Sequence, residues 1–159
     1  MDQPSSDLTK RAALAALPLA SGLAAVLVVT GFVPCCGLIV FPAGAFGIAY
    51  YLTPRLGVYP TPETKSALAL NIGMGIGLAA MGSLVIATLV GQLLGLLFTS
   101  ALGALQRDLS SLAFGLTFSI AFFFVYLLVA VIGGAAVGVL CAYLGALLGL
   151  DQVRPAQYY

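Results

Sequence analysis

No charged residue occurs in the stretch SALALNIGMGIGLAAMGSLVIATLVGQLLGLLFTSALGALQ, Ser66–Gln106, and this decides the class of the fold. Two further stretches, Ala12–Pro54 and Leu109–Leu150, are equally free of charge. One helical bilayer crossing needs about 20 apolar residues, and each stretch is about twice that length. The chain is 62% hydrophobic and 7% charged, whereas a soluble domain has about 25% charged residues. We therefore predict an all-α integral membrane protein with several crossings.

Polar breaks divide this single membrane domain, residues 1–159, into segments. A basic start followed by an apolar run resembles a signal peptide, but the run continues unbroken, and we interpret it as a retained first helix. Thr61, Pro62 and Glu63 form a helix-start signal, with a capping residue, a proline and an acid in order. We expect a helical hairpin over residues 12–52, a polar loop over 53–65, and glycine-rich helices over 66–106 and 109–150.

The number of crossings follows from the positive charges, because cytoplasmic loops carry an excess of Lys and Arg. With four transmembrane helices, only Arg107 lies apart from the group Lys10, Arg11, Arg55, Lys65 and Arg154. With six, every positive charge lies on one side, but a turn is then needed near Ser83–Gly91, where no turn residue occurs. We expect four crossings, with six as the alternative, and cytoplasmic termini in both arrangements.

The adjacent residues Cys35 and Cys36, within GFVPCCGLIVFP, raise the question of a metal or redox site. A metal site needs several converging ligands, and the chain has no histidine and one other cysteine, Cys141. A disulfide between adjacent cysteines would be strained. We interpret both as small apolar residues in a turn between helices, with redox chemistry or palmitoylation as alternatives. We expect no metal and no cofactor.

Glycines four residues apart recur along both long helices and let helix backbones approach closely. We expect these glycines to pack helices together, either within the chain or against a partner chain. A weakly polar stripe on the third apolar stretch includes Gln92 and Thr99, the candidate pore-lining residues of a channel. The helix-packing candidates are Gly73, Gly77, Gly91, Gly95, Gly134, Gly138, Gly145 and Gly149.

The absence of charge inside the apolar stretches bears directly on function. Ionisable residues within a membrane mark ion paths and substrate sites, and a nucleophile needs an adjacent base. Neither pattern occurs, and a net charge of +1 offers no field for nucleic acid. We therefore expect a non-catalytic structural or accessory subunit that packs against a larger membrane complex, or against itself, among membrane lipids. The alternative is a small channel or transporter.

The segments CCGLIVFPAGAFGIAYYL and SALALNIGMGIGLAAMG together suggest a family. This order of a Cys-Cys-Gly turn, a Pro/Gly-containing helix, a polar loop and an Ala/Gly-rich helix resembles small bacterial multi-pass membrane proteins of an uncharacterised domain family. The resemblance covers about residues 30–90. It implies a protein of the bacterial inner membrane and no known activity.

Overall fold

The computed structural model describes residues 5–30, 34–106 and 109–153. Four α-helices and one short 3-10 helix account for nearly all of this part of the chain. They are α1 (Ser5–Thr30), α2 (Pro34–Leu52), η1 (Thr53–Leu56), α3 (Lys65–Gln106) and α4 (Leu109–Asp151). The protein is therefore all-helical over the described residues, as the composition predicts.

The start of α3 lies close to the sequence signal at Thr61. The Thr61 carbonyl accepts a hydrogen bond from the Lys65 backbone N–H at 3.0 Å, and the Thr64 hydroxyl accepts one from the Thr61 N–H at 3.1 Å. Residues 62–64 form a turn, and Lys65, which we had assigned to the loop, is the first residue of the helix. The polar loop also contains structure of its own, because η1 follows α2 directly and is closed by left-handed Gly57.

The segment containing Cys35 and Cys36 differs from the expected turn. The helix α2 already begins at Pro34, so both cysteines have helical backbones. Proline suits this first position, because its missing N–H has no partner at a helix start. The cysteine side chains lie outside the described part of the structure, as do residues 31–33, so the interpretation of both cysteines as small apolar residues stays a prediction.

The two long helices, α3 and α4, are each continuous from end to end. The turn that six crossings require is absent, because Ser83–Gly91 lies within α3. The glycines Gly133 and Gly134 likewise lie within α4 and do not divide it. At 1.5 Å per residue, α3 is about 63 Å long, or twice the thickness of a bilayer core. The extended third helix is therefore a single element, and the alternative of six crossings is wrong.

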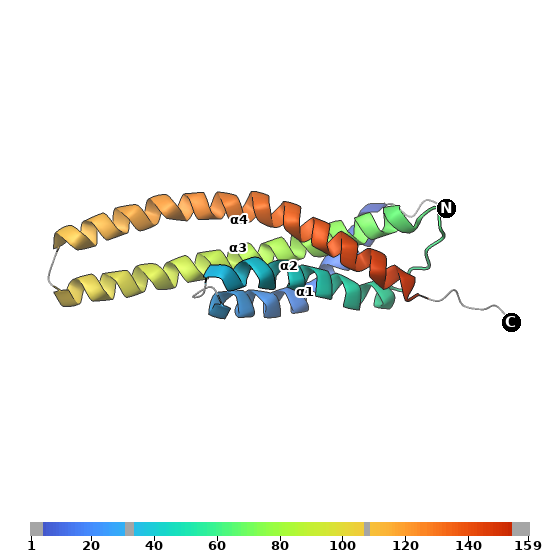
Figure 1. Ribbon diagram of the computed structural model, residues 1–159, viewed down its shortest axis with the longest axis horizontal. Helices are drawn as coiled ribbons and strands as arrows, with labels where there is room; N and C mark the ends of the chain where they lie inside the picture. Colours follow the sequence, from blue (N-terminus) through green and yellow to red (C-terminus); the bar gives the residue numbers. More distant parts are fainter. Residues whose placement is uncertain (1–4, 31–33, 107–108, 154–159) are drawn as a thin grey trace.

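The four helices lie alongside one another over only half of the molecule (Figure 1). There α1 packs mainly on α3 and α2 mainly on α4, while α3 and α4 also contact each other. We call this part, with residues 65–88 of α3 and 130–151 of α4, the four-helix half. Beyond it α3 and α4 continue as a pair without α1 or α2 (Figure 1). We call residues 89–106 of α3 and 109–129 of α4 the arm.

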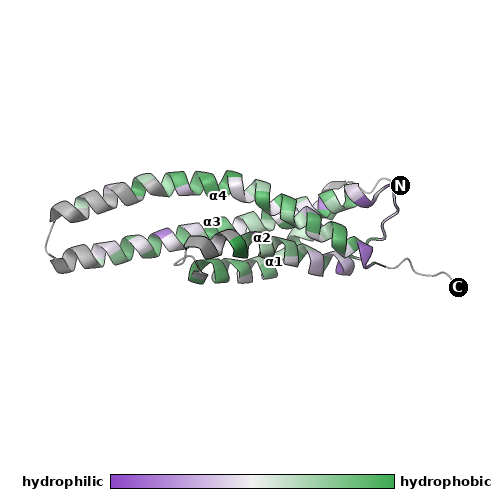
Figure 2. Cartoon of the chain, viewed as in Figure 1, coloured by the Kyte–Doolittle hydropathy of each residue, from purple (hydrophilic) through white to green (hydrophobic). Residues whose placement is uncertain are grey.

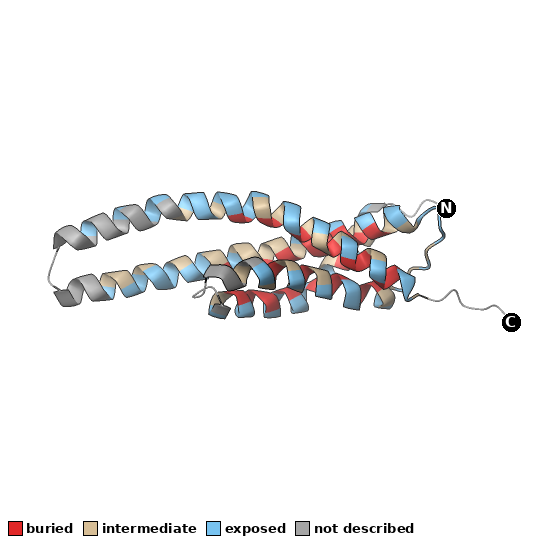
Figure 3. Cartoon of the chain, in the orientation of Figure 1, coloured by how far each residue is buried: buried red, intermediate tan, exposed pale blue. Residues whose placement is uncertain are grey.

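Small side chains fill the core, which is confined to the four-helix half (Figure 3). Among the described residues, the largest side chains that are almost completely buried are Ile72, Ile76, Leu150 and Thr53. The other hydrophobic residues with no exposed surface are alanines, so the helix backbones approach one another closely. These alanines are Ala12, Ala16, Ala45, Ala49, Ala69, Ala80, Ala142 and Ala146. In the arm, by contrast, no residue whose burial the structure describes is buried.

Hydrophilic residues gather at the end of the molecule where α1 begins and α4 ends (Figure 2). There Lys65 and Asp151 form an ion pair that joins the start of α3 to the end of α4. Among the described residues, three helices contain segments long and apolar enough to cross a membrane: Ser6–Val29, Lys65–Ala101 and Phe123–Asp151. The protein is thus helical over its described residues, and three of its helices are long and apolar enough to cross a membrane.

Candidate functional site

Two of the predicted packing glycines lie where α3 crosses α4. A Cβ atom placed on Gly73 would lie 2.7 Å from the Cα of Tyr143, and one on Gly77 would lie 2.6 Å from the Cα of Val139. Real Cβ atoms do not approach a backbone so closely. These glycines therefore allow α3 and α4 to meet backbone to backbone, the geometry that small residues permit in membrane helices.

The glycines of α4 face the other helices of the same chain. A Cβ on Gly138 would meet the Gly77 carbonyl oxygen and the Phe41 ring, each at 3.1 Å. One on Gly145 would meet the Phe46 carbonyl of α2, and one on Gly149 would lie 2.9 Å from Thr53 Cβ. Gly134 lies against the end of the Leu84 side chain. All four therefore serve contacts within the chain.

Gly91 and Gly95 differ from the other six candidates. In the part of the chain that the structure describes, no heavy atom outside the local helix lies within 4 Å of a Cβ placed on either residue. Both are exposed and lie in the arm of α3. Six of the eight candidate glycines therefore pack within the chain, and among the eight this pair alone is open.

The sequence reasoning missed the glycines and alanines that join α1 to its neighbours. A Cβ on Gly75 would meet the Thr9 carbonyl of α1, and one on Gly44 of α2 would meet the Leu23 side chain. The buried residues Ala12, Ala16 and Ala20 repeat at four-residue spacing on the face of α1 that packs. That spacing was visible in the sequence and follows the same rule as the glycine pairs.

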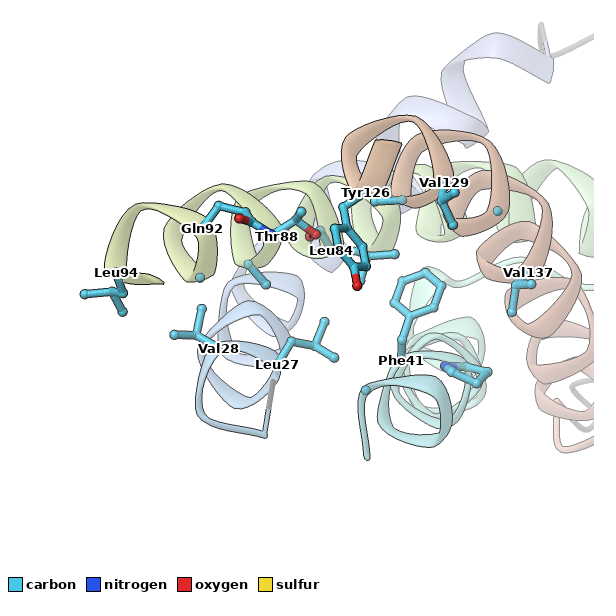
Figure 4. A pocket seen from close by; sticks show the side chains of 17 residues that line it. Leu27, Val28, Phe41, Leu84, Thr88, Gln92, Leu94, Tyr126, Val129 and Val137 are labelled. Atoms are coloured by element: carbon cyan, nitrogen blue, oxygen red, sulfur yellow. The ribbon is translucent and has the colours of Figure 1, made fainter. Parts of the chain in front are cut away.

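A groove of about 730 Å³ opens where the four-helix half meets the arm (Figure 4). All four helices contribute to it, and none of the described residues that line it carries a charge. Its volume lies within the roughly 300–1,000 Å³ that is typical of small-molecule sites. The lining residues are Leu27, Val28, Gly37, Phe41, Pro42, Leu84, Ala87, Thr88, Gly91, Gln92, Leu94, Tyr126, Val129, Ala130, Gly133, Gly134 and Val137.

Three side chains bring polar atoms to this apolar groove: Thr88, Gln92 and Tyr126. The Thr88 hydroxyl donates to the Leu84 carbonyl at 2.8 Å and keeps lone pairs that can accept a hydrogen bond. Within the described structure, Gln92 makes no hydrogen bond, so its amide can both donate and accept. Figure 4 shows Thr88 and Gln92 on successive turns of α3, with the Tyr126 phenol entering from α4.

The two candidate pore residues have different surroundings. Gln92 lines the groove, whereas Thr99 does not. The Thr99 hydroxyl donates to the Gly95 carbonyl at 2.8 Å, the usual bond of a threonine within a helix. Both side chains are half-buried. The structure therefore does not join these two residues in one cavity.

Aromatic and charged residues cluster at the end of α2. The Arg55 guanidinium carbon lies 3.5 Å from the centre of the Tyr51 ring, and its Nη1 donates to the Tyr51 carbonyl at 2.9 Å. Gln152 donates to the Tyr50 hydroxyl, which links the end of α4 to α2. Tyrosine and arginine together suit the boundary between lipid and water. Among the described residues, no three His, Cys, Asp or Glu side chains are placed to hold a metal ion.

No family model matches the chain, and neither the comparison with curated proteins nor that with solved structures gives a match. The resemblance over residues 30–90 therefore stays a prediction. The function has to be argued from the geometry of the groove and the arm.

Proposed function

We propose that this chain is a non-catalytic accessory subunit of the bacterial inner membrane. In this proposal α2 crosses the membrane in addition to α1, α3 and α4, which makes four crossings. The arm docks on another protein, either a larger membrane complex or a second copy of the chain. At 19 residues, α2 is about 28 Å long, close to the thickness of a bilayer core. The excess of Lys and Arg on one side supports an arrangement with both termini in the cytoplasm.

The arm supports this proposal because its length does not suit a bilayer alone. If the four-helix half spans the membrane upright, the arm of α3 extends about 27 Å beyond it. Accommodating all of α3 in a core of about 30 Å would require a tilt of about 60°. Membrane helices tilt by up to about 40°. An upright molecule therefore carries its arm outside the hydrocarbon.

The arm is too apolar to face water. Leu93, Leu97 and Phe98 of α3 each expose about 60–69% of their surface, and Phe124 and Leu128 of α4 are similarly open. Burying one such side chain contributes about 1.5–3 kcal/mol. A protein surface that covers the arm would gain this contribution several times over.

The exposed apolar surface of the arm is the observation that carries the proposal. Leu93, Leu97, Phe98, Phe124 and Leu128 are all exposed there. A stable interface buries about 800 Å² on each partner, and a contact along the arm would cover these side chains.

The proposal is tested by the size of the particle that a mild detergent extracts from membranes containing the chain at its native level. We expect a particle larger than the 16.2 kDa chain with its detergent. Leu97→Gln, in the arm, should release the chain from this particle, because the added amide would be buried at the interface. Leu14→Gln is the matched control, since Leu14 is equally exposed on α1, away from the arm. A monomeric wild type would contradict the proposal.

A further inference from the structure

We propose that the arm swings on the four-helix half about a hinge formed by Gly91 of α3 and by Gly133 and Gly134 of α4. All three glycines line the groove where the two parts of the molecule meet, so they lie close to one level along the paired helices. The hinge is a property of the single chain and does not depend on the proposed function.

Glycine makes both helices easy to bend at this level. It has no Cβ atom and loses more backbone freedom on ordering than any other residue, so an interior glycine weakens a helix relative to alanine. Sharp bends in helices occur mainly at prolines, at pairs of glycine or serine, and at bulges. Gly133 and Gly134 form such a pair, and α4 changes direction where the arm joins the four-helix half (Figure 1). The glycine pair accounts for this bend.

Neighbouring side chains do not hold the helices straight at the hinge. Among the described heavy atoms outside each local helix, none lies within 4 Å of a Cβ placed on Gly91 or Gly133. Gly134 meets the end of the flexible Leu84 side chain, which can move aside. At Gly77, by contrast, the backbone of α4 itself lies 2.6 Å from the added Cβ. Close packing therefore fixes the helices within the four-helix half and leaves the junction free to bend.

The two helices of the arm bend together, as a hairpin. Only residues 107 and 108 separate α3 from α4, so a change of angle in one helix requires a change in the other. The helices α1 and α2 do not accompany the arm (Figure 1), and none of its residues with a described burial is buried. Segments with few buried contacts lie at the low end of local stability. The arm is thus the mobile part, and the four-helix half is the fixed base.

Pulsed dipolar spectroscopy on the purified full-length chain in phosphatidylcholine nanodiscs tests the hinge. In a variant without the natural cysteines, spin labels at the exposed positions Val29 and Ile120 connect the end of α1 to the arm. Ile120 lies about 20 Å along α4 from Gly133, so a change of about 20° in the bend moves it by about 7 Å. We expect a distance distribution about 7 Å wider than that between Leu14 and Leu140, which are exposed within the four-helix half.

Alanine substitutions show whether the glycines cause this extra width. In the double variant Gly91→Ala, Gly133→Ala, the added methyl groups meet no described atom outside the local helix. Alanine in place of a compatible glycine stiffens the backbone. The double variant should therefore at least halve the extra width of the Val29–Ile120 distribution. Circular dichroism confirms that it is folded.

Gly82→Ala is the matched control. Gly82 is equally open and lies on α3, but the buried residues Ala80 and Ser83 beside it fix this turn within the four-helix half. The substitution should leave the width of the distribution unchanged.

Two results would overturn the proposal. The first is a Val29–Ile120 distribution as narrow as that of the Leu14–Leu140 pair, which would show a rigid arm. The second is a broad distribution that the double variant leaves unchanged, or that Gly82→Ala narrows equally, which would assign the movement to the whole length of the helices.

Discussion

Glycines with the same spacing have different roles in this protein. Gly73 and Gly77 bring α3 within backbone contact of α4, whereas Gly91 and Gly95, farther along the same helix, have open space. Helical periodicity places residues four apart on one face but does not show what that face meets. The sequence therefore predicts the packing pairs, and only the fold separates internal pairs from the open one.

This difference leads to a prediction about stability. Gly77→Leu should destabilise the protein by about 1–3 kcal/mol, as over-packing commonly does, because its Cβ would collide with the α4 backbone at Val139. Gly82→Leu, one turn away with open space, should change the stability by less than this. Unfolding in mixed detergent micelles measures both. Equal effects would show that Gly77 does not lie at the crossing.

The same reasoning decides the role of Gly138, for which the sequence left packing within the chain and contact with a partner both open. Gly138→Leu would have released the chain from its assembly had the residue faced outward. Its Cβ would instead lie 3.1 Å from both the Gly77 carbonyl and the Phe41 ring. The substitution therefore disturbs the internal crossing of α2, α3 and α4, and of the eight candidates only Gly91 and Gly95 have open space for a partner.

Charged residues and prolines in the sequence indicate where a helix begins or ends. Whether a long apolar stretch forms one continuous helix is harder to predict. A charged side chain is unfavourable in an apolar environment, so charges lie near the ends of uncharged stretches. Thr61 and Lys65 thus indicate the start of α3 to within a few residues. No local signal shows whether a long apolar stretch folds back or continues, since both choices are equally apolar. The sequence therefore predicts α3 as one helix over residues 66–106 but leaves the hairpin of the six-crossing arrangement open as an alternative.

The continuity of α3 can be measured with two spin labels. Labels at Leu70 and Leu97, both exposed on α3, should lie about 40 Å apart at 1.5 Å per residue. Pulsed dipolar spectroscopy in nanodiscs gives this distance. A hairpin near Ser83–Gly91 would bring the labels within about 20 Å of each other, and such a value would contradict a continuous α3.

The arrangement of the whole molecule is what the sequence could not predict. The groove takes residues from all four helices, which are far apart in the sequence, and its walls consist of ordinary membrane-helix residues. The polar stripe did indicate Gln92, which lines this groove, but it also included Thr99, which does not. Composition predicts the helical class because it reports the average environment, whereas a site depends on which helix faces come together.

A further prediction concerns topology. The start of α1 and the end of α4 lie at the same end of the molecule (Figure 1), and the excess of positive charge predicts that this end faces the cytoplasm. Cysteines introduced at Gln3 and Gln157, in a variant lacking the natural cysteines, should resist a membrane-impermeant maleimide in intact cells. Both should react after the membrane is opened. Labelling of either site from outside would contradict cytoplasmic termini, and labelling of only one would also contradict an even number of crossings.

The central claim is that the arm is covered by another protein, and photo-crosslinking in living cells tests it most directly. A photoreactive amino acid is introduced at Leu97, which is 59% exposed in the arm, and separately at Leu14, which is 66% exposed on α1. We predict that illumination converts the Leu97 variant into a discrete adduct of higher mass and leaves the Leu14 variant as a single chain. The absence of a protein adduct at Leu97, or equal adducts at both positions, would contradict the account.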